Sequence, residues 1–466
     1  MKKILNLENI LCVFIIICPI LDMISFLYRN VFGTNFSPST ITRPIIPAIV
    51  ILYLFLKKDK KFKLYLFVVA VIYGIYSLVH LYIFTKVKTG MSYSNEIHEL
   101  QYLVNYTFMV LNLFLYTYIF KNSNVEKLKK SVVIAIGTYI VSIFLAIFTG
   151  TSSSTYIEGM GYKGWFESGN SISAILLLSM FIYLPYIKNK KYRKIVIPIL
   201  ILVGIFLCLL IGTRAGLFGF ILIISLYVAI EIIYNVIKNK KINKKFVFVG
   251  IGAVAIIIIV VVGFGSNTIQ RRKHLKEIEG NIVDEEKQEN SHITGSLLEI
   301  KEKIEDGTIE ENYMSEEQKK SILDLYKIAN DLEVKNNDQR MQQLIYNLVL
   351  VKNQKNSLLI LFGNGYMANY RELVFEMEVL AILINFGLLG FTLYLGPFIA
   401  ILILGLYKGI KNIKQIDDEY VFLLFGSAFA FALSLFSGYT FFNSSTMMVI
   451  IVLNSVLCSK INNVEQ

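Results

Sequence analysis

Arginine is the residue in this sequence best suited to bind an anion, and it is used sparingly. Eight of the 46 basic residues are arginine. Its planar guanidinium binds phosphate or carboxylate through two parallel hydrogen bonds, a geometry that lysine lacks. Arg214 stands in the apolar stretch LCLLIGTRAGLFGF with no carboxylate near it in sequence. An unpaired arginine at a membrane boundary costs on the order of a few kcal/mol. We therefore predict that Arg214 binds an anion; the simpler alternative is a helix-end arginine that reaches the headgroups.

Two further arginines are weaker candidates. Arg43 precedes Pro44 at the predicted outer end of an apolar run and could add to an anion site or snorkel to the interface. Arg371 adjoins Glu372 and could pair with it. Either arginine could therefore serve structure alone.

A pair of carboxylates could provide a general base. Glu376 and Glu378 open the apolar stretch FEMEVLAILINFGLLGF. Residues two positions apart on a helix are separated by about 200° around its axis, so only one of the two glutamates can face a cavity. We favour Glu378, which lies deeper along the apolar run, with Glu376 next. Both could instead be solvated carboxylates at a helix start.

The remaining polar candidates are an aromatic residue and two histidines. Trp165 suits either a membrane-interface aromatic belt or a sugar-stacking platform. His98, between Glu96 and Glu99 in a predicted external loop, could line an acceptor groove. His80, inside an apolar run, is expected to be a buried structural histidine. No cysteine has metal-ligand spacing, so we predict neither a metal nor a cofactor.

The composition shows which elements must hold these residues. Of 466 residues, 55% are hydrophobic and 17% are charged, which is too apolar for a typical soluble protein. Apolar runs long enough to cross a bilayer recur along the chain and predict an all-α polytopic membrane protein with about twelve spans. We place them at 9–29, 41–56, 62–85, 100–120, 131–149, 170–187, 195–212, 215–237, 246–264, 375–407, 420–437 and 440–458.

Lysine-rich loops set the predicted orientation. The loops 57–61, 121–130, 188–194, 238–245 and 408–414 alternate with lysine-poor ones. The positive-inside rule puts these five loops and both termini in the cytoplasm, which leaves the stretch 265–373 outside. Helix-forming composition predicts two or three amphipathic helices in this stretch, one of them at about 338–352. The expected domains are thus 1–264 with nine spans, the external loop 265–373, and 374–466 with the last three spans.

Several motifs resemble those of the O-antigen ligase and polysaccharide polymerase superfamily. GTRAG lies between two predicted spans, and GYKGWFESGNSIS, which contains Asn170, precedes it. DQRMQQLIYNLVL and LFGNGY close the large loop, and SGYTFFNSS links the last two spans. The order of these motifs around one large loop carries the resemblance, which covers about 150–458.

The resemblance implies a GT-C-type membrane glycosyltransferase that acts at the outer face on undecaprenyl-diphosphate-linked glycans. It implies that Arg214 and Arg340 bind the pyrophosphate. Weak candidates for contacts with the acceptor or the sugar are Trp165, Asn170, His98 and Arg371. Ligases carry a histidine near the start of the span after the large loop, where this chain has glutamates. We therefore favour a polymerase of cell-surface polysaccharide in the plasma membrane. A ligase for a finished glycan and a flippase of lipid-linked oligosaccharide are the alternatives, and no nucleic-acid partner is expected.

Overall fold

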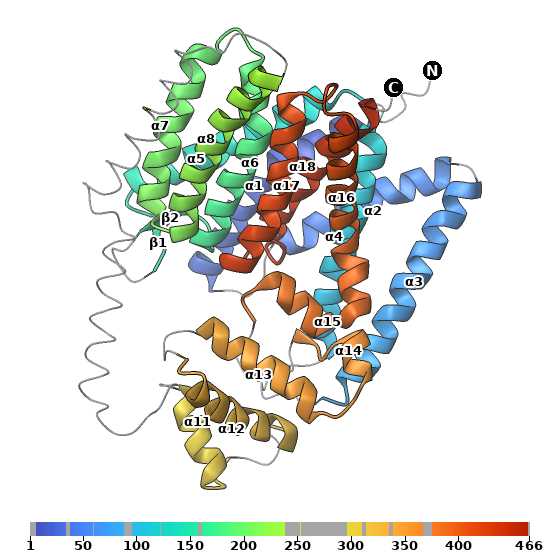
Figure 1. Cartoon of the computed structure of the whole chain (residues 1–466), viewed down its shortest axis with the longest axis vertical. Helices are drawn as coiled ribbons and strands as arrows, with labels where there is room; N and C mark the ends of the chain where they lie inside the picture. Colours follow the sequence, from blue (N-terminus) through green and yellow to red (C-terminus); the bar gives the residue numbers. More distant parts are fainter. Residues whose placement is uncertain are drawn as a thin grey trace. The chain divides into compact units, whose positions relative to one another are not determined.

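The computed structural model describes residues 6–33, 38–58, 60–87, 96–121, 123–156, 161–237, 252, 296–309, 314–334, 339–366 and 375–464. The elements up to the middle of the chain are α1 (Leu7–Phe32), α2 (Pro38–Lys57), α3 (Lys60–Phe84), α4 (Glu96–Phe120), α5 (Val125–Phe148), β1 (Ser153–Ser154), β2 (Tyr162–Gly164), α6 (Gly169–Lys188), α7 (Arg193–Ile211) and α8 (Arg214–Ile237). The later elements are α11 (Ser296–Glu305), α12 (Glu316–Asp331), α13 (Gln339–Asn353), α14 (Leu358–Phe362), α15 (Glu378–Tyr394), α16 (Gly396–Lys411), α17 (Asp418–Phe436) and α18 (Ser444–Asn463) (Figure 1).

The chain is an all-α polytopic membrane protein. Within the described ranges, nine helices are long and apolar enough to cross a membrane, and the bent pair α15 and α16 raises this to ten. The span predicted at 246–264 lies outside the described residues, so the count of about twelve stays a prediction. Among the described residues, the sequence predicted neither the small antiparallel ribbon of β1 and β2 nor the short helix α14.

The helices fall into two compact units. Unit 1 comprises Met1–Leu54, Met109–His274 and Phe398–Gln466, and unit 2 comprises Phe55–Phe108 and Leu275–Pro397. The predicted domain boundaries at 264 and 373 follow the chain, whereas these units collect segments distant in sequence. Those boundaries remain predictions.

Unit 1 is built around α6 and α18. In an apolar stretch of 18 residues, 89% of the α6 residues and 78% of the α18 residues are buried, whereas only 22% of the α7 residues are. On α7 the side chains of Ile195, Ile199, Leu202 and Phe206 are all more than half exposed. Their spacing forms one apolar stripe. In a membrane protein such a stripe faces lipid, so α7 is a peripheral helix of the unit.

Ion pairs gather helix ends at one end of unit 1. Lys129 near the start of α5 donates to Glu419 at the start of α17 over 2.7 Å. Lys460 near the end of α18 lies 2.7 Å from the same carboxylate. Lys188, which ends α6, contacts Asp418. These ends adjoin segments predicted to be cytoplasmic, so their meeting agrees with the predicted alternation of spans.

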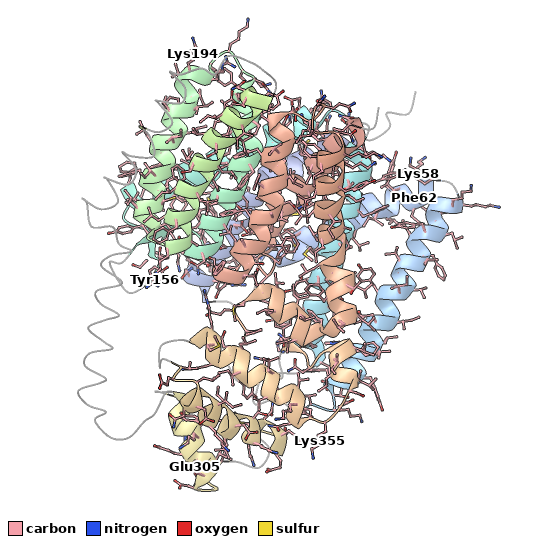
Figure 2. All side chains as sticks on the ribbon, in the orientation of Figure 1. Lys58, Phe62, Tyr156, Lys194, Glu305 and Lys355 are labelled. Atoms are coloured by element: carbon pink, nitrogen blue, oxygen red, sulfur yellow. The ribbon has the colours of Figure 1, made fainter. Side chains whose placement is uncertain are left out.

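The helices α11, α12 and α13 of unit 2 share a small hydrophobic core. Ile322, Leu325, Tyr346 and Leu350 are fully buried in it. The helix predicted at about 338–352 is α13, and α12 begins with a capping box between Ser315 and Gln318. Glu305 and Lys355 are exposed and lie at the rim of this group (Figure 2).

One predicted helix start was wrong, and one predicted span contains a bend. The helix α4 begins at Glu96, so His98 lies in its first turn rather than in a loop. The acidic residues Glu96 and Glu99 favour this earlier start because they complement the helix dipole. The predicted span 375–407 is two helices, α15 and α16, bent by 49° at their junction. Inside α15, Gly387 adopts φ 68° and ψ −177°, a conformation open in practice only to glycine.

Candidate functional site

The GTRAG turn places Arg214 at the start of α8. Gly212 ends α7 in the left-handed conformation (φ 76°). The hydroxyl of Thr213 accepts a hydrogen bond from Gly216 N over 3.1 Å and lies 2.6 Å from the Ser173 hydroxyl of α6. A Cβ on Gly216 would come within 2.6 Å of the Thr213 hydroxyl, so the turn excludes larger residues there.

Arg214 itself is exposed. No hydrogen bond or ion pair joins it to any residue that the structure describes. A guanidinium at a helix N-terminus, with the backbone N–H groups of the first turn beside it, is a favourable place for an anion. The geometry of the turn therefore suits the predicted role of Arg214.

Three of the sequence motifs meet in unit 1. A Cβ on Gly161 would collide with the carbonyl of Ile211, so the segment before α6 lies directly on the GTRAG turn. Asn170 on α6 donates to Ser437 O over 3.4 Å, and Thr446 on α18 donates to Ser171 O over 3.4 Å. These bonds join the glycine-rich segment to the SGYTFFNSS link.

The two weak sugar-contact candidates of this region have partners of their own. Trp165 is half-buried, and its indole N–H donates to the Thr151 hydroxyl over 2.8 Å. Asn170 uses its amide N–H for Ser437. Beside Trp165, burial lowers the pKa of Lys163 below its usual value, an effect that Glu167 opposes. A sugar role for Trp165 and Asn170 stays a prediction.

Arg43 is a buried member of an ion-pair network rather than an exposed arginine. It is 8% exposed, pairs with Asp22 of α1, and donates to the hydroxyls of Ser444 and Ser445. Asp22 also accepts from the Tyr139 hydroxyl over 2.6 Å. These contacts tie α1, α2, α5 and α18 together. They favour a structural role for Arg43, and phosphate binding by it gains no support.

Unit 2 holds the candidate base. Glu378 is fully buried as the first residue of α15, and Glu376 precedes the helix and is exposed. Glu376 is not helical, so the predicted 200° separation of the two carboxylates around one helix was wrong. The start of α15 separates the two carboxylates instead. The buried position of Glu378 suits a general base, and the exposed position of Glu376 suits a solvated carboxylate.

Arg340, at the start of α13, is a neighbour of Glu376. Its Nε lies 3.5 Å from Glu376 Oε2, with 37% and 45% of the two side chains exposed. A partly exposed pair of this length contributes little to stability. More than a third of the Arg340 side chain is exposed, so a ligand in solution can reach it. Arg371 lies outside the described residues.

Unit 2 contains a buried histidine–carboxylate pair, and the contact between its two residues was not predicted from the sequence. His80 Nε2 lies 2.9 Å from Glu99 Oε1, and both side chains are fully buried. His80 Nδ1 lies 2.6 Å from Phe362 O, and Glu99 Oε2 accepts from Tyr366 N over 3.0 Å. The pair thus holds both ends of the LFGNGY turn. An ionisable residue inside an apolar run is usually paired or functional. This signal was present in the sequence for the His80–Glu99 pair and for Asp22.

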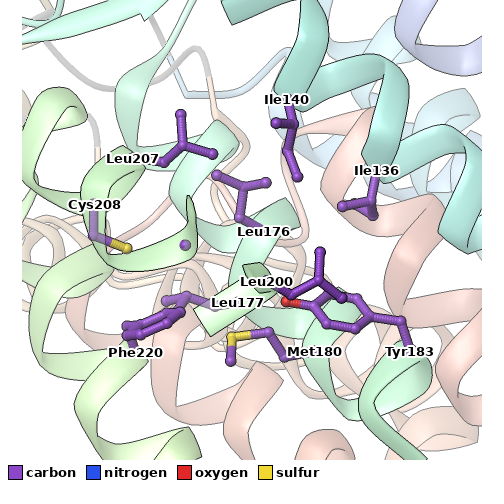
Figure 3. Close-up of a pocket in the computed structure, with 11 residues that line it drawn as sticks. Ile136, Ile140, Leu176, Leu177, Met180, Tyr183, Leu200, Leu207, Cys208 and Phe220 are labelled. Atoms are coloured by element: carbon purple, nitrogen blue, oxygen red, sulfur yellow. The ribbon is translucent and has the colours of Figure 1, made fainter. Parts of the chain in front are cut away.

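One cavity among the described residues of unit 1 has an apolar lining. It lies between α5, α6, α7 and α8 (Figure 3). Its lining consists of Ile136, Ile140, Leu176, Leu177, Met180, Tyr183, Leu200, Gly204, Leu207, Cys208 and Phe220. None of the candidate site residues lines it.

The comparison with known families matches these observations. The chain matches the family described as O-antigen ligase like membrane protein over residues 6–464. The chain belongs to this family. Membership implies a membrane enzyme that transfers glycans. No curated protein matches the chain significantly. As a member of the O-antigen ligase like family, the chain carries Arg214 in unit 1 and Arg340, Glu376 and Glu378 in unit 2.

Proposed function

We propose that this member of the O-antigen ligase like family polymerises undecaprenyl-diphosphate-linked oligosaccharide repeat units into a cell-surface polysaccharide at the outer face of the plasma membrane. The match to the family over almost the whole chain is the observation that carries the proposal. Two structural features support it. Arg214 is exposed at the hydrogen-bonded GTRAG turn, and Glu378 is buried.

In the proposed reaction the acceptor hydroxyl oxygen attacks the anomeric carbon of the donor glycan. The bond from that carbon to the pyrophosphate oxygen breaks, and undecaprenyl diphosphate leaves. Arg214 and Arg340 stabilise the charge that develops on the leaving group. Glu378 accepts the proton of the attacking hydroxyl. The enzyme's own residues thus supply an electrostatic group at the leaving oxygen and a base at the acceptor.

A ligase is the second candidate, because the family description itself refers to O-antigen ligases. Ligase and polymerase share the bond changes above and differ in the acceptor. In the proposed polymerase the acceptor is another lipid-linked glycan, so products grow by repeat units. The absence of a histidine from the sequence 375–391, which holds Glu376 and Glu378, favours the polymerase.

The test uses the purified protein in lipid vesicles that contain undecaprenyl-diphosphate-linked repeat units. A ladder of products spaced by one repeat, with release of undecaprenyl diphosphate, is expected. A single transfer, seen only when a separate acceptor is added, would assign the ligase instead. Movement of intact lipid-linked oligosaccharide across vesicles without any new glycosidic bond would assign a flippase and overturn the proposal.

A further inference from the structure

Two buried asparagines in unit 2 have polar atoms that no protein group satisfies. Asn364, in the LFGNGY turn, and Asn385, in α15, are both fully buried. Neither the Oδ1 nor the Nδ2 atom of either side chain has a hydrogen-bond partner among the described residues. Buried amides without partners are rare in folded proteins, and lipid offers no substitute. The four atoms therefore indicate a ligand that the protein atoms do not include.

The backbone brings the two asparagines side by side. Asn364 N donates to Ile384 O over 3.3 Å, and Gly365 N donates to Asn385 O over 2.9 Å. A Cβ on Gly363 would collide with the Asn385 carbonyl. The turn and the broken part of α15 thus lie in direct backbone contact at the two asparagines.

The neighbouring polar groups are already engaged. Both ring nitrogens of His80 and both oxygens of Glu99 have partners. The carbonyl of Phe386 accepts from the Tyr76 hydroxyl over 2.6 Å. None of these bonds involves the side-chain amide of Asn364 or of Asn385.

We propose that Asn364 and Asn385 form a binding site for a neutral hydroxyl group, that of an ordered water or of a glycan. Each amide presents one acceptor and two donors. A cation would satisfy only the two Oδ1 atoms, and an anion only the two Nδ2 groups. A hydroxyl both donates and accepts, so a single such group matches both kinds of unpartnered atom.

The sign of a stability change tests the site. Asn385→Leu replaces the amide with an apolar side chain of similar size. If a hydroxyl is bound, the substitution removes real hydrogen bonds and lowers the apparent melting temperature. If the amides are truly unpaired, the substitution removes a buried unsatisfied group and raises it. The matched control is Asn454→Leu. Asn454 Oδ1 accepts from the Ser427 hydroxyl and its Nδ2 donates to Ile450 O, so the loss of this amide must destabilise.

Radiolytic labelling reports the ligand directly, because hydroxyl radicals formed from a bound water oxidise the side chains beside it. Phe386, which is fully buried, should be labelled in the wild type and less so in Asn385→Leu. Phe181, equally buried in unit 1, is the control and should stay unlabelled. Absence of labelling above this control, or a higher melting temperature for Asn385→Leu, overturns the proposal.

Adding lipid-linked oligosaccharide distinguishes the two sources of the hydroxyl. Loss of labelling at Phe386 means that a glycan hydroxyl replaces the water. Unchanged labelling makes water the resident ligand. Both melting and labelling are measured without turnover, so the site can stand even if the proposed polymerase reaction fails.

Discussion

Glu378 is the residue at which the proposed chemistry can be tested most directly. Its carboxylate is buried at the start of α15, whereas Glu376 is exposed beside Arg340. Replacing a general base typically costs about 10²–10⁴-fold in rate. Glu378→Gln, which keeps size and hydrogen bonding, is expected to lose chain growth by this factor while lipid-linked repeat units accumulate. Polymer length on gels, from purified protein, is the measurement.

Glu376→Gln is the matched control for this carboxylate and is expected to polymerise at close to the wild-type rate. A defect in Glu376→Gln with a normal Glu378→Gln would exchange the two roles. Normal polymerisation by both would show that no carboxylate acts as base here, and would move the catalytic burden to the arginines.

The second residue-scale prediction concerns Arg214. Its guanidinium fork, and not its charge alone, is proposed to hold the pyrophosphate, so lysine should replace it poorly. Arg214→Lys is expected to lose most polymer at normal expression, and Arg340→Lys likewise. Arg193→Lys is the control, since Arg193 also begins a spanning helix but lies at a predicted cytoplasmic end. Full-length polymer from Arg214→Lys at the normal rate would refute the role.

At the scale of the element, the break in α15 is the feature most exposed to mutation. Gly387→Ala would force a side chain into a left-handed conformation and against the Leu361 backbone. We expect a loss of about 1–3 kcal/mol or more in the free energy of unfolding. The loss should appear as a lower melting temperature of the purified protein.

Gly137→Ala provides the comparison within a helix. Gly137 lies inside α5 with no atom within 4 Å of an added Cβ. Alanine is favoured over glycine in a helix by about 0.5–1 kcal/mol, so this variant should be as stable as the wild type or more so. Equal behaviour of the two variants would mean that the break in α15 is not required.

The amphipathic helix at 338–352 and most spans could be predicted from hydrophobic periodicity, because that pattern is local. The break at Gly387 could not, since a glycine in an apolar run looks the same in a straight helix. The break is possible because the LFGNGY turn, some 20 residues earlier in the chain, donates hydrogen bonds to the α15 carbonyls near the break. The start of α4 was also not predicted. This helix begins before its apolar run does, and its first turn contains polar residues such as His98.

The candidate site was predictable in part for the same reason. Residue type and motif order indicated Arg214, Glu378 and Arg340 from the sequence. The partners that define each residue's environment are distant along the chain. Asp22 and Ser445 enclose Arg43, and the sequence gives no sign of that meeting.

At the scale of the whole molecule, orientation is the prediction on which the outer-face proposal rests. Glu302 is exposed on α11 and is predicted to be extracellular, whereas Asn189 is exposed after α6 and is predicted to be cytoplasmic. In intact cells an impermeant maleimide is expected to label Glu302→Cys but not Asn189→Cys. The native Cys12, Cys18 and Cys208 are buried, which keeps the background low. The reverse labelling would invert the topology and remove the outer-face assignment.

The hydrogen bonds between the LFGNGY turn and α15 also bear on how the chain is made. A spanning helix normally enters the bilayer with its backbone bonds complete within itself. The carbonyls of Ile384 and Asn385 instead accept from Asn364 N and Gly365 N, which belong to a segment synthesised earlier. α15 therefore cannot finish its insertion alone. The preceding segment must be in place before these backbone hydrogen bonds of α15 can form, which couples the insertion of α15 to the placement of the turn before it.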